Sequence, residues 1–350
     1  MKILILKPSS LGDVVQALPV ARLIRSHFPA ATVDWWIHTD LVPLLADDPD
    51  IHRVIPFDRK AWGRPSGFIA AGREISGLRR ERYDWVLDLQ ALARSAAVAW
   101  LTRGALTVGL DDRREGAPAA YDLAVPRPGP NRHAVEWYLA VLRTLKVPIH
   151  WNFEWIPHHP RAAAAIRSLS CGDETVWIAL QPGARWMNKR WPVTHYGELA
   201  RRLTLRDPRW RVAVLGGPGD RPLGEEVTRV AGNRTVDLTG RLSLPEMIEL
   251  IRNCALMVTN DTGPMHVAAA LRRPVLALFG PTDPARTGPY GQQNSVLQVG
   301  LDCVPCLKSS CSHPIPMACL AGLEVERVVR EALDRLESAR PPPCPDAPKP

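Results

Sequence analysis

Two short segments of the chain combine residue types that could do chemistry. In the first, an apolar run leads into Ser9-Ser10-Leu11-Gly12-Asp13, so that a carboxylate lies where a strand would turn into a helix. A carboxylate at the carboxyl edge of a sheet could accept a proton from an attacking hydroxyl. The same spacing also allows a plain helix cap by Ser10 and Asp13, and the two interpretations are compatible.

The second segment, Met257 to Ala270, has the pattern of a strand, a tight turn and the start of a helix. Gly263 would permit close backbone approach, and Thr262 with the amides of the first helical turn would face an anion. The alternative is an ordinary helix cap by Asp261 or Thr262, with Pro264 in the first turn.

Two further turns would lie beside this segment. The apolar run at 176–181 leads into a turn that carries Arg185 and Lys189 in a chain whose other basic residues are mostly arginines. A lysine kept there suits a compact charge on a phosphate, although a solvated surface lysine remains possible. A glycine-rich turn at 216–220 lacks the full dinucleotide spacing, so we expect it only to shape a nucleotide pocket.

These turns need strands and helices to position them, and the sequence shows two series of such elements. Strands that are apolar throughout predict parallel sheets covered on both faces, hence a doubly wound α/β fold. Strands are expected at 2–7, 32–38, 53–57, 85–90, 107–110, 175–181, 211–216, 235–238, 256–260 and 274–279. Helices are expected at 13–28, 67–81, 93–103, 133–146, 192–206, 221–231, 244–253 and 264–271.

The two series predict two Rossmann-like domains that face a cleft. The first is expected at 1–156 and would bind an acceptor, and the second at 174–322 would bind a nucleotide sugar. A proline- and histidine-containing break near 156–173 would link them. A last helix is expected at 323–338, and the proline-rich tail at 341–350 is expected to be disordered.

Composition narrows the class of partner. A net charge of +8 and a pI near 9.3 indicate an anionic partner. Basic residues are not interleaved with aromatics, so nucleic acid ranks last. The first apolar stretch is too short for a signal peptide, and no apolar run approaches the roughly 18 residues that span a bilayer. We therefore expect a soluble, cytoplasmic protein that could touch a membrane surface.

The seven cysteines are unevenly spread. An odd number without a signal peptide argues against a disulfide framework. Four of them cluster with the spacing Cys-x2-Cys-x4-Cys-x7-Cys, namely Cys303, Cys306, Cys311 and Cys319, with His313 among them. By spacing they could bind zinc, but the pairing is irregular and a second Cys-x2-Cys is missing. Reduced structural thiols are the favoured interpretation over a metal.

The motifs, taken in order, resemble those of the heptosyltransferases of lipopolysaccharide core assembly. They are Ser9 to Asp13, the lysine-bearing turn before Trp191-Pro192, Asp261 to His266, and Phe279 to Pro284, and the similarity extends from residue 2 to about residue 335. The resemblance implies a GT-B fold without a cofactor. It also implies inverting transfer of heptose from ADP-heptose to the inner core, Kdo or the first heptose, of a lipid A-linked acceptor near the cytoplasmic face of the inner membrane.

The same resemblance assigns roles to individual residues. Asp13 is implied as the base and Lys189 as the phosphate-binding lysine. Nucleotide and sugar contacts are implied for Ala184, Arg185, Asp261, Thr262, Gly263 and His266. Acceptor-binding residues are implied to be Arg59, Lys60, Arg64 and Arg114, unless these are only solvated loop charges. Where the member specific for the first heptose has hydroxyl residues at the phosphate turn, this chain has Ala184 and Arg185.

Other functions remain open on sequence alone. A related glycosyltransferase could use another nucleotide sugar or acceptor, and donor screening would separate it. A nucleotide-sugar epimerase of similar architecture would need no acceptor. A non-catalytic scaffold at a membrane surface would lose no more than a helix cap if Asp13 were replaced.

Overall fold

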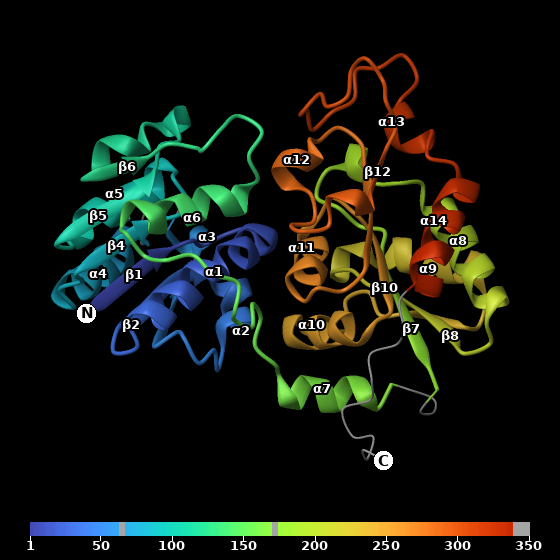
Figure 1. Ribbon diagram of the computed structural model, residues 1–350, viewed down its shortest axis with the longest axis horizontal. Coiled ribbons are helices and arrows are strands. Elements are labelled where there is room, and N and C mark those ends of the chain that lie inside the picture. Colours follow the sequence, from blue (N-terminus) through green and yellow to red (C-terminus); the bar gives the residue numbers. More distant parts are fainter. Residues whose placement is uncertain (63–66, 170–173, 339–350) are drawn as a thin grey trace. The chain divides into compact units, whose positions relative to one another are not determined.

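The computed structural model describes residues 1–62, 67–169 and 174–338. The predicted tail at 341–350 lies outside the described residues. Contacts within the chain separate two compact units, with the boundary between Pro157 and His158. Each unit contains one six-stranded sheet in which every pair of neighbouring strands is parallel (Figure 1). The predicted doubly wound α/β class is therefore confirmed.

The sheet of the first unit has the strand order β3-β2-β1-β4-β5-β6. Its strands are β1 (Lys2–Leu6), β2 (Thr32–His38), β3 (Arg53–Phe57), β4 (Trp85–Asp88), β5 (Leu106–Leu110) and β6 (Leu123–Val125). The helices are α1 (Leu11–His27), α2 (Val42–Leu45), α3 (Arg59–Trp62), α4 (Gly67–Arg80), α5 (Ala93–Thr102) and α6 (Ala134–Thr144). The central strand β1 is buried from Ile3 to Leu6, as a strand covered by helices on both faces requires.

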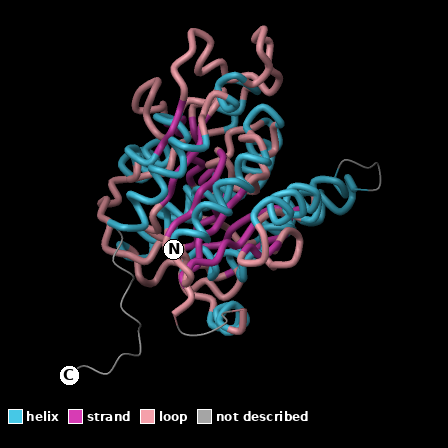
Figure 2. The backbone as a smooth tube through the Cα atoms, turned by 90° about the vertical axis from the view of Figure 1, so that its right-hand side faces the viewer, coloured by secondary structure: helices cyan, strands magenta, loops and turns pink. Residues whose placement is uncertain are grey.

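The sheet of the second unit has the order β12-β11-β10-β7-β8-β9. Its strands are β7 (Val176–Gln181), β8 (Trp210–Val214), β9 (Thr235–Asp237), β10 (Leu256–Asn260), β11 (Val275–Phe279) and β12 (Val296–Gln298). All five residues of β10 and of β11 are buried. In the tube view the strands of the chain, in magenta, lie among helices, in cyan (Figure 2).

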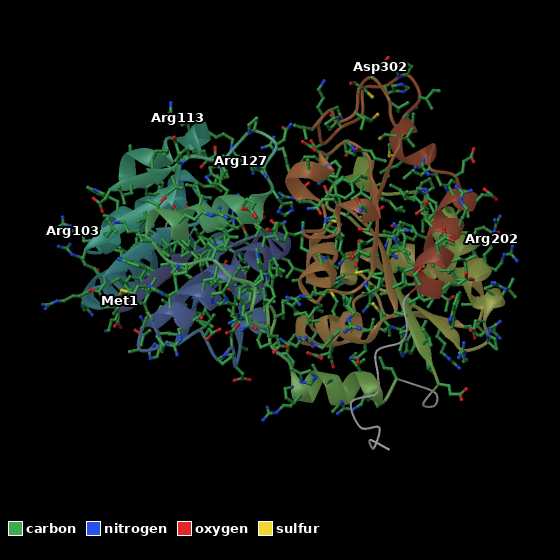
Figure 3. All side chains as sticks on the ribbon, in the orientation of Figure 1. Met1, Arg103, Arg113, Arg127, Arg202 and Asp302 are labelled. Carbon is green, nitrogen blue, oxygen red and sulfur yellow. The ribbon has the colours of Figure 1, made fainter. Side chains whose placement is uncertain are left out.

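The helices of the second unit bury side chains that recur at helical spacing, as α14 shows. They are α7 (Pro160–Arg167), α8 (Val193–Arg206), α9 (Arg221–Ala231), α10 (Leu244–Asn253), α11 (Gly263–Ala270), α12 (Pro284–Thr287), α13 (Ala318–Ala321) and α14 (Val325–Ser338). In α14 the buried residues Val325, Val328, Ala332 and Leu336 recur at helical spacing. This face packs against α8, where Arg202, labelled in Figure 3, pairs with Glu326 at 2.8 Å.

The structure adds elements that the sequence pattern did not predict. The edge strands β6 and β12 have three residues each, too few to produce a recognisable pattern. The break predicted at 156–173 contains α7, whose N-terminus is tied to α10 because His159 N donates to Glu249 Oε1 at 2.9 Å.

Strand order also locates the places where ligands are expected. In each sheet the chain first adds strands on one side of the unit's first strand and then crosses over to add strands on its other side. This topological switch point lies between β1 and β4 in the first unit and between β10 and β7 in the second. Ligands of doubly wound folds bind outside the carboxyl ends of the strands at such points.

Candidate active site

Lys189 and Asp261 meet at the switch point of the second unit. Lys189 follows β7, Asp261 follows β10, and Lys189 Nζ lies 2.6 Å from Asp261 Oδ2. Thr282, which follows β11, donates its hydroxyl to the same carboxylate oxygen at 2.7 Å. The lysine also lies over the Trp186 ring, 4.7 Å from its centroid. The turns after β7, β10 and β11 therefore meet at one lysine–aspartate ion pair.

Asn260 joins the turns after β7 and β10. This fully buried side chain donates to Pro182 O at 2.8 Å and accepts a hydrogen bond from Trp191 N at 3.1 Å. A buried amide satisfied on both sides fixes the separation of the two backbones it connects. The sequence pattern included Asn260 only as one residue of the anion-binding segment Met257 to Ala270.

The N-terminus of α11 presents its first turn beside this ion pair. Thr262 is the extended N-cap residue, and the helix runs from Gly263 to Ala270. Thr262, Gly263 and His266 are all half-buried, so each is accessible from solvent. Because the unpaired amides of a helix start carry partial positive charge, this end attracts anions.

The remaining predicted donor residues divide into a buried and an exposed position. Ala184 is buried, and its carbonyl accepts a hydrogen bond from Arg190 Nε at 2.9 Å. Arg185 is exposed at the surface of the same turn. Ala184 therefore contributes backbone shape, while Arg185 is available to solvent.

The glycine-rich turn after β8 packs against the turn after β7. A Cβ atom added to Gly183 would lie 2.6 Å from Asp220 Cγ, well inside contact distance. The Asp220 carboxylate is held there because it accepts a hydrogen bond from Gly217 N at 3.0 Å. Gly183 is thus required by close approach of a side chain from the neighbouring turn.

In the first unit Asp13 lies at the start of α1, just after β1. Ser10 donates both its backbone N–H (3.0 Å) and its hydroxyl (2.6 Å) to Asp13 Oδ2. The side chain is half-buried. Ser243 and Glu246 at the start of α10 form the same arrangement, with distances of 2.7 and 2.6 Å. Asp13 therefore caps α1.

Sequence reasoning missed a buried charge cluster behind Asp13. Lys7 directly follows β1, is 4% exposed, and has its Nζ 5.2 Å from the centroid of the Tyr138 ring. Burial works to lower the pKa of the Lys7 ammonium, but Tyr138, Asp13 and Asp88 outweigh it and raise that pKa above its usual value. The available signal was a lysine at the end of an otherwise apolar strand.

Asp88, at the end of β4, faces the same switch point and is fully buried. Tyr121 donates its hydroxyl to Asp88 Oδ2 at 2.8 Å, and Gln90 N donates to Asp88 Oδ1 at 2.9 Å. Burial raises the pKa of this carboxyl, although these hydrogen bonds act in the opposite direction. The sequence pattern included Asp88 only as part of a strand.

Comparison with known proteins identifies the family to which the chain belongs. The model of glycosyltransferase family 9 (heptosyltransferase) matches residues 72–315. The chain belongs to this family. It is 32% identical to lipopolysaccharide heptosyltransferase 1 of Pseudomonas aeruginosa over 326 residues, which cover 89% of this chain and 88% of the relative. It is therefore a glycosyltransferase, as the motifs predicted.

Two comparisons with Escherichia coli proteins agree. Lipopolysaccharide heptosyltransferase 2 of strain K12 is 30% identical over 317 residues, covering 85% of this chain and 88% of the relative. The solved structure of E. coli ADP-heptose lps heptosyltransferase II superposes with a TM-score of 0.78 at 26% identity, covering 97% of this chain and 99% of that one. The fold is thus the GT-B type expected from the resemblance.

The predicted acceptor-binding residues of this family 9 member that the structure describes lie in two exposed places. Arg59 and Lys60 belong to the short helix α3, and among the described residues neither side chain has a hydrogen-bond or ion-pair partner. Arg114 instead pairs with Asp112, with 2.9 Å between Arg114 Nε and Asp112 Oδ1. Arg64 lies outside the described residues. Arg113, labelled in Figure 3, is exposed beside Arg114.

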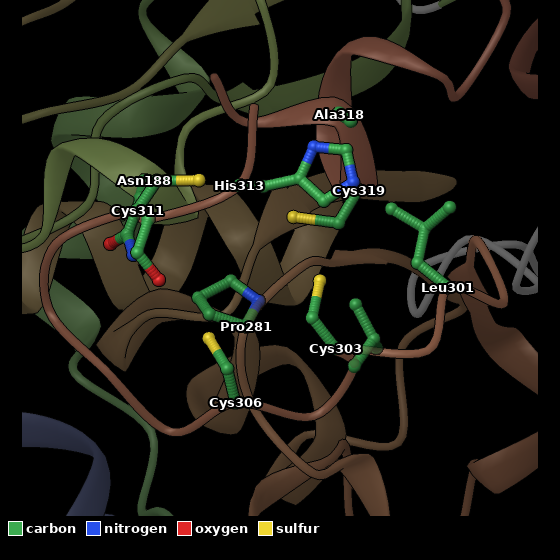
Figure 4. A pocket seen from close by; sticks show the side chains of 11 residues that line it. Asn188, Pro281, Leu301, Cys303, Cys306, Cys311, His313, Ala318 and Cys319 are labelled. Carbon is green, nitrogen blue, oxygen red and sulfur yellow. The ribbon is translucent and has the colours of Figure 1, made fainter. Parts of the chain in front are cut away.

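The structure also bears on metal ions and on membranes. In the part of the chain that the structure describes, no three His, Cys, Asp or Glu side chains are close enough together to hold a metal ion. The four clustered cysteines nevertheless border one cavity (Figure 4). Across residues 1–62, 67–169 and 174–338, no helix is both long and apolar enough to cross a membrane.

Proposed function

We propose that this glycosyltransferase transfers a heptose, with inversion, from ADP-heptose to the inner core of lipopolysaccharide. The observation that carries the proposal is the Lys189 ammonium, 2.6 Å from Asp261 at the switch point of the second sheet and beside the start of α11. A diphosphate needs such a set of fixed positive groups. The names of the two heptosyltransferase relatives and of the ADP-heptose lps heptosyltransferase II structure support the choice of sugar and nucleotide.

On the donor side, Lys189 binds the diphosphate. An ammonium group has three N–H donors, so Lys189 can keep its bond to Asp261 and still donate to phosphate oxygens. The first-turn amides of α11, after Thr262, donate to the same group, and Arg185 adds charge from the solvent side. As the bond to the sugar breaks, negative charge grows on the departing ADP, and these donors stabilise it where it forms.

On the acceptor side, Asp13 accepts the proton of the attacking hydroxyl. Ser10 fixes the carboxylate through Oδ2, and the buried Lys7 ammonium interacts with its negative charge. A carboxylate is a weak base, but the hydroxyl becomes acidic as its oxygen bonds to the anomeric carbon, so a weak base suffices. Inversion follows because the hydroxyl attacks the face of the sugar opposite the departing diphosphate.

The acceptor is an acidic saccharide, Kdo or the first heptose, linked to lipid A. Arg59, Lys60, Arg64 and Arg114 are proposed to bind its carboxylate or phosphate groups. The support is that Arg59 and Lys60 are exposed and have no side-chain partner within the described residues. Arg114 would have to exchange Asp112 for the acceptor, which makes it the weaker of these contacts.

A lipid-linked acceptor also requires the enzyme to reach a membrane. We propose transient contact with the cytoplasmic face of the inner membrane, where the net charge of +8 would be attracted to anionic lipid headgroups. Cosedimentation with anionic vesicles, compared with neutral vesicles, measures this contact. Equal recovery with both vesicle types would contradict it.

The function is tested by calorimetric titration of ADP, ADP-heptose and a UDP-sugar, followed by a transfer assay. The acceptors are heptose-less lipopolysaccharide and core that carries one heptose. We expect ADP-heptose binding and transfer to one of the two acceptors, which also shows which heptose is added. Conversion of the donor without an acceptor would instead indicate an epimerase, and absence of ADP binding would contradict the donor site.

A further inference from the structure

The outer sides of α4 and α5 carry apolar side chains and arginines together. The two helices of the first unit pack against each other (Figure 1). Exposed residues of α4 recur at helical spacing, namely Ile69, Arg73, Ser76 and Arg80. One stripe of this helix therefore faces solvent along most of its length, with Ile69 65% exposed at its start.

The exposed side of α5 is largely apolar. Its inner side buries Ser95, Ala96, Val98, Ala99 and Thr102. Its outer side presents Arg94, Ala97, Trp100 and Leu101. The Trp100 side chain is 62% exposed and that of Leu101 is 39% exposed. Apolar side chains that gather at a surface and are bordered by polar groups indicate a binding partner.

A groove beside Trp100 extends this apolar surface. It has a volume of about 270 Å³ and lies between α5 and the short helix η3 (Ala117–Ala120). Its lining is mostly alanine together with Trp100, and it contains one acidic residue, Glu115. That carboxylate is engaged, because Glu115 Oε2 accepts a hydrogen bond from Ala93 N at 2.9 Å. The groove can therefore take apolar groups without leaving this carboxylate unpaired.

The arginines around these apolar side chains have no counter-charge. The set is exposed and consists of Arg73, Arg79, Arg80, Arg82, Arg94 and Arg103, the last labelled in Figure 3. Among the described residues, none of their side chains has a hydrogen-bond or ion-pair partner, and Arg94 only lies over the Phe57 ring. The charge of these arginines is thus available to a ligand.

The acidic residues of the same stretch are bound elsewhere. Glu74 Oε1 accepts a hydrogen bond from Trp36 Nε1 at 2.7 Å. Glu81 Oε2 lies 2.9 Å from Lys2 Nζ, and Asp84 Oδ2 accepts from Lys2 N at 2.7 Å. The sequence at 91–105, which contains α5, has no acidic residue. The uncompensated charge around Trp100 is therefore positive.

We propose that the outer sides of α4 and α5, with the groove beside Trp100, bind the surface of an anionic lipid bilayer. Trp100, Leu101 and Ile69 enter the interface, where indole rings are preferred. The arginine side chains reach the headgroup phosphates. The inference rests on the membrane contact proposed above and assigns it to one surface of the first unit, but it does not depend on which sugar is transferred.

A second copy of the chain fits this surface less well than a bilayer does. A two-fold dimer brings the same surface of two chains into contact. The arginines of one chain would then face those of the other, and like charges in an interface repel. Lipid phosphates instead offer a negative charge to every arginine on the surface.

The apolar part of the surface is tested by cosedimentation of the full-length protein with vesicles of equal parts phosphatidylglycerol and phosphatidylcholine. We expect Trp100→Ser to lower the partition coefficient at least about 10-fold, because the side chain that enters the interface is lost. Leu205→Ser is the matched control, since Leu205 on α8 is 63% exposed, as Trp100 is at 62%. It should bind as the wild type does. Circular dichroism checks that each variant is folded.

The charged part is tested with the double variant Arg73→Gln/Arg80→Gln. Its partition coefficient should fall about 25-fold, because each basic residue near an anionic surface contributes about fivefold. The control Arg161→Gln/Arg167→Gln removes the same charge from exposed positions on α7. Its binding should change less than about twofold, since salt screens charges that lie away from the bilayer. Equal losses in both double variants would overturn the assigned surface.

A measurement on the wild type covers variants that do not fold. Hydrogen exchange should slow in peptides that cover 69–80 and 93–102 when the anionic vesicles are added, and should not slow in α8. Absence of binding to these vesicles, or protection confined to other segments, would overturn the proposal. A dimer in sedimentation velocity that Trp100→Ser dissociates would assign the surface to a second copy instead.

A transfer assay separates this surface from the proposed function. With a water-soluble acceptor freed of its acyl chains, Trp100→Ser should transfer as fast as the wild type, because this residue acts only on the bilayer. If the wild type binds vesicles through this surface but transfers no sugar, the proposed function fails and the surface stands. Slower transfer by Trp100→Ser to the soluble acceptor would contradict a role confined to the membrane.

Discussion

Lys189 Nζ and Asp261 Oδ2 lie 2.6 Å apart although the two residues are far apart in the sequence. Their side chains are 17% and 7% exposed, so the pair is partly withdrawn from water but reachable by a ligand. Thr282 completes the environment of the carboxylate. A lysine fixed in this way is oriented before the diphosphate arrives, which reduces the entropy lost on binding.

Replacing Lys189 by Met should weaken ADP binding about 10- to 150-fold, because a charge-assisted hydrogen bond contributes roughly 1.5–3 kcal/mol. Calorimetry measures the affinity. Since Lys189→Met also leaves Asp261 without its cation, the double variant with Asp261→Asn separates lost phosphate contact from lost stability. Lys146→Met, at an exposed position in the first unit, is the control. Equal ADP affinity in wild type and double variant would remove Lys189 from the donor site.

Replacing Asp13 by Asn should lower the turnover rate about 10²- to 10⁴-fold, the usual contribution of a general base. Binding of ADP-heptose should be unchanged. Loss of a cap alone would cost about 1 kcal/mol of stability and leave turnover intact. Glu246→Gln is the matched control, because Glu246 makes the same bonds to Ser243 that Asp13 makes to Ser10. If both variants retain turnover, Asp13 is only a helix cap.

Replacing Gly183 by Ala should destabilise the second unit by about 1–3 kcal/mol and weaken ADP binding, because the new methyl group meets the Asp220 carboxylate. Urea unfolding measures the free energy. Gly219→Ala is the control, since a Cβ there meets no atom within 4 Å. It should change stability by less than about 0.5 kcal/mol. Similar losses in both variants would show that the close contact with Asp220 is not the cause.

Asp88 should make stability depend on pH. Burial raises the pKa of this carboxyl in the folded state above its unfolded value, near 3.9. The folded protein then holds the proton more tightly, so this contribution is present below the unfolded pKa and is lost as pH rises through the folded pKa. Unfolding free energies measured from pH 4 upward should therefore fall for the wild type relative to Asp88→Asn. A difference independent of pH would contradict the raised pKa.

The sequence predicted the strands that form the two switch points because their positions are apolar throughout. Lys2–Leu6, Val176–Gln181 and Leu256–Asn260 are buried on both faces, and such runs cannot be mistaken for surface loops. The three-residue strands β6 and β12 were missed because pairing with a neighbour, rather than their own pattern, makes them strands.

The site was predictable where it lies in a local turn and not where distant chains meet. Lys189 and Asp261 could each be selected from turn residues next to an apolar run. The bonds of Asn260 to Pro182 and Trp191, and the burial of Lys7 beside Tyr138, depend on tertiary contacts between segments far apart in sequence. Local patterns carry no information about such pairs.

The most direct test of the account is one transfer reaction with ADP-heptose and the two lipopolysaccharide acceptors, run with wild type and Asp13→Asn at saturating donor. Mass spectrometry of the acceptor is the readout. The account predicts that one acceptor gains a single heptose with the wild type and gains it at least about 100-fold more slowly with Asp13→Asn. An acceptor mass unchanged by the wild type, under conditions where ADP-heptose binds, would contradict it.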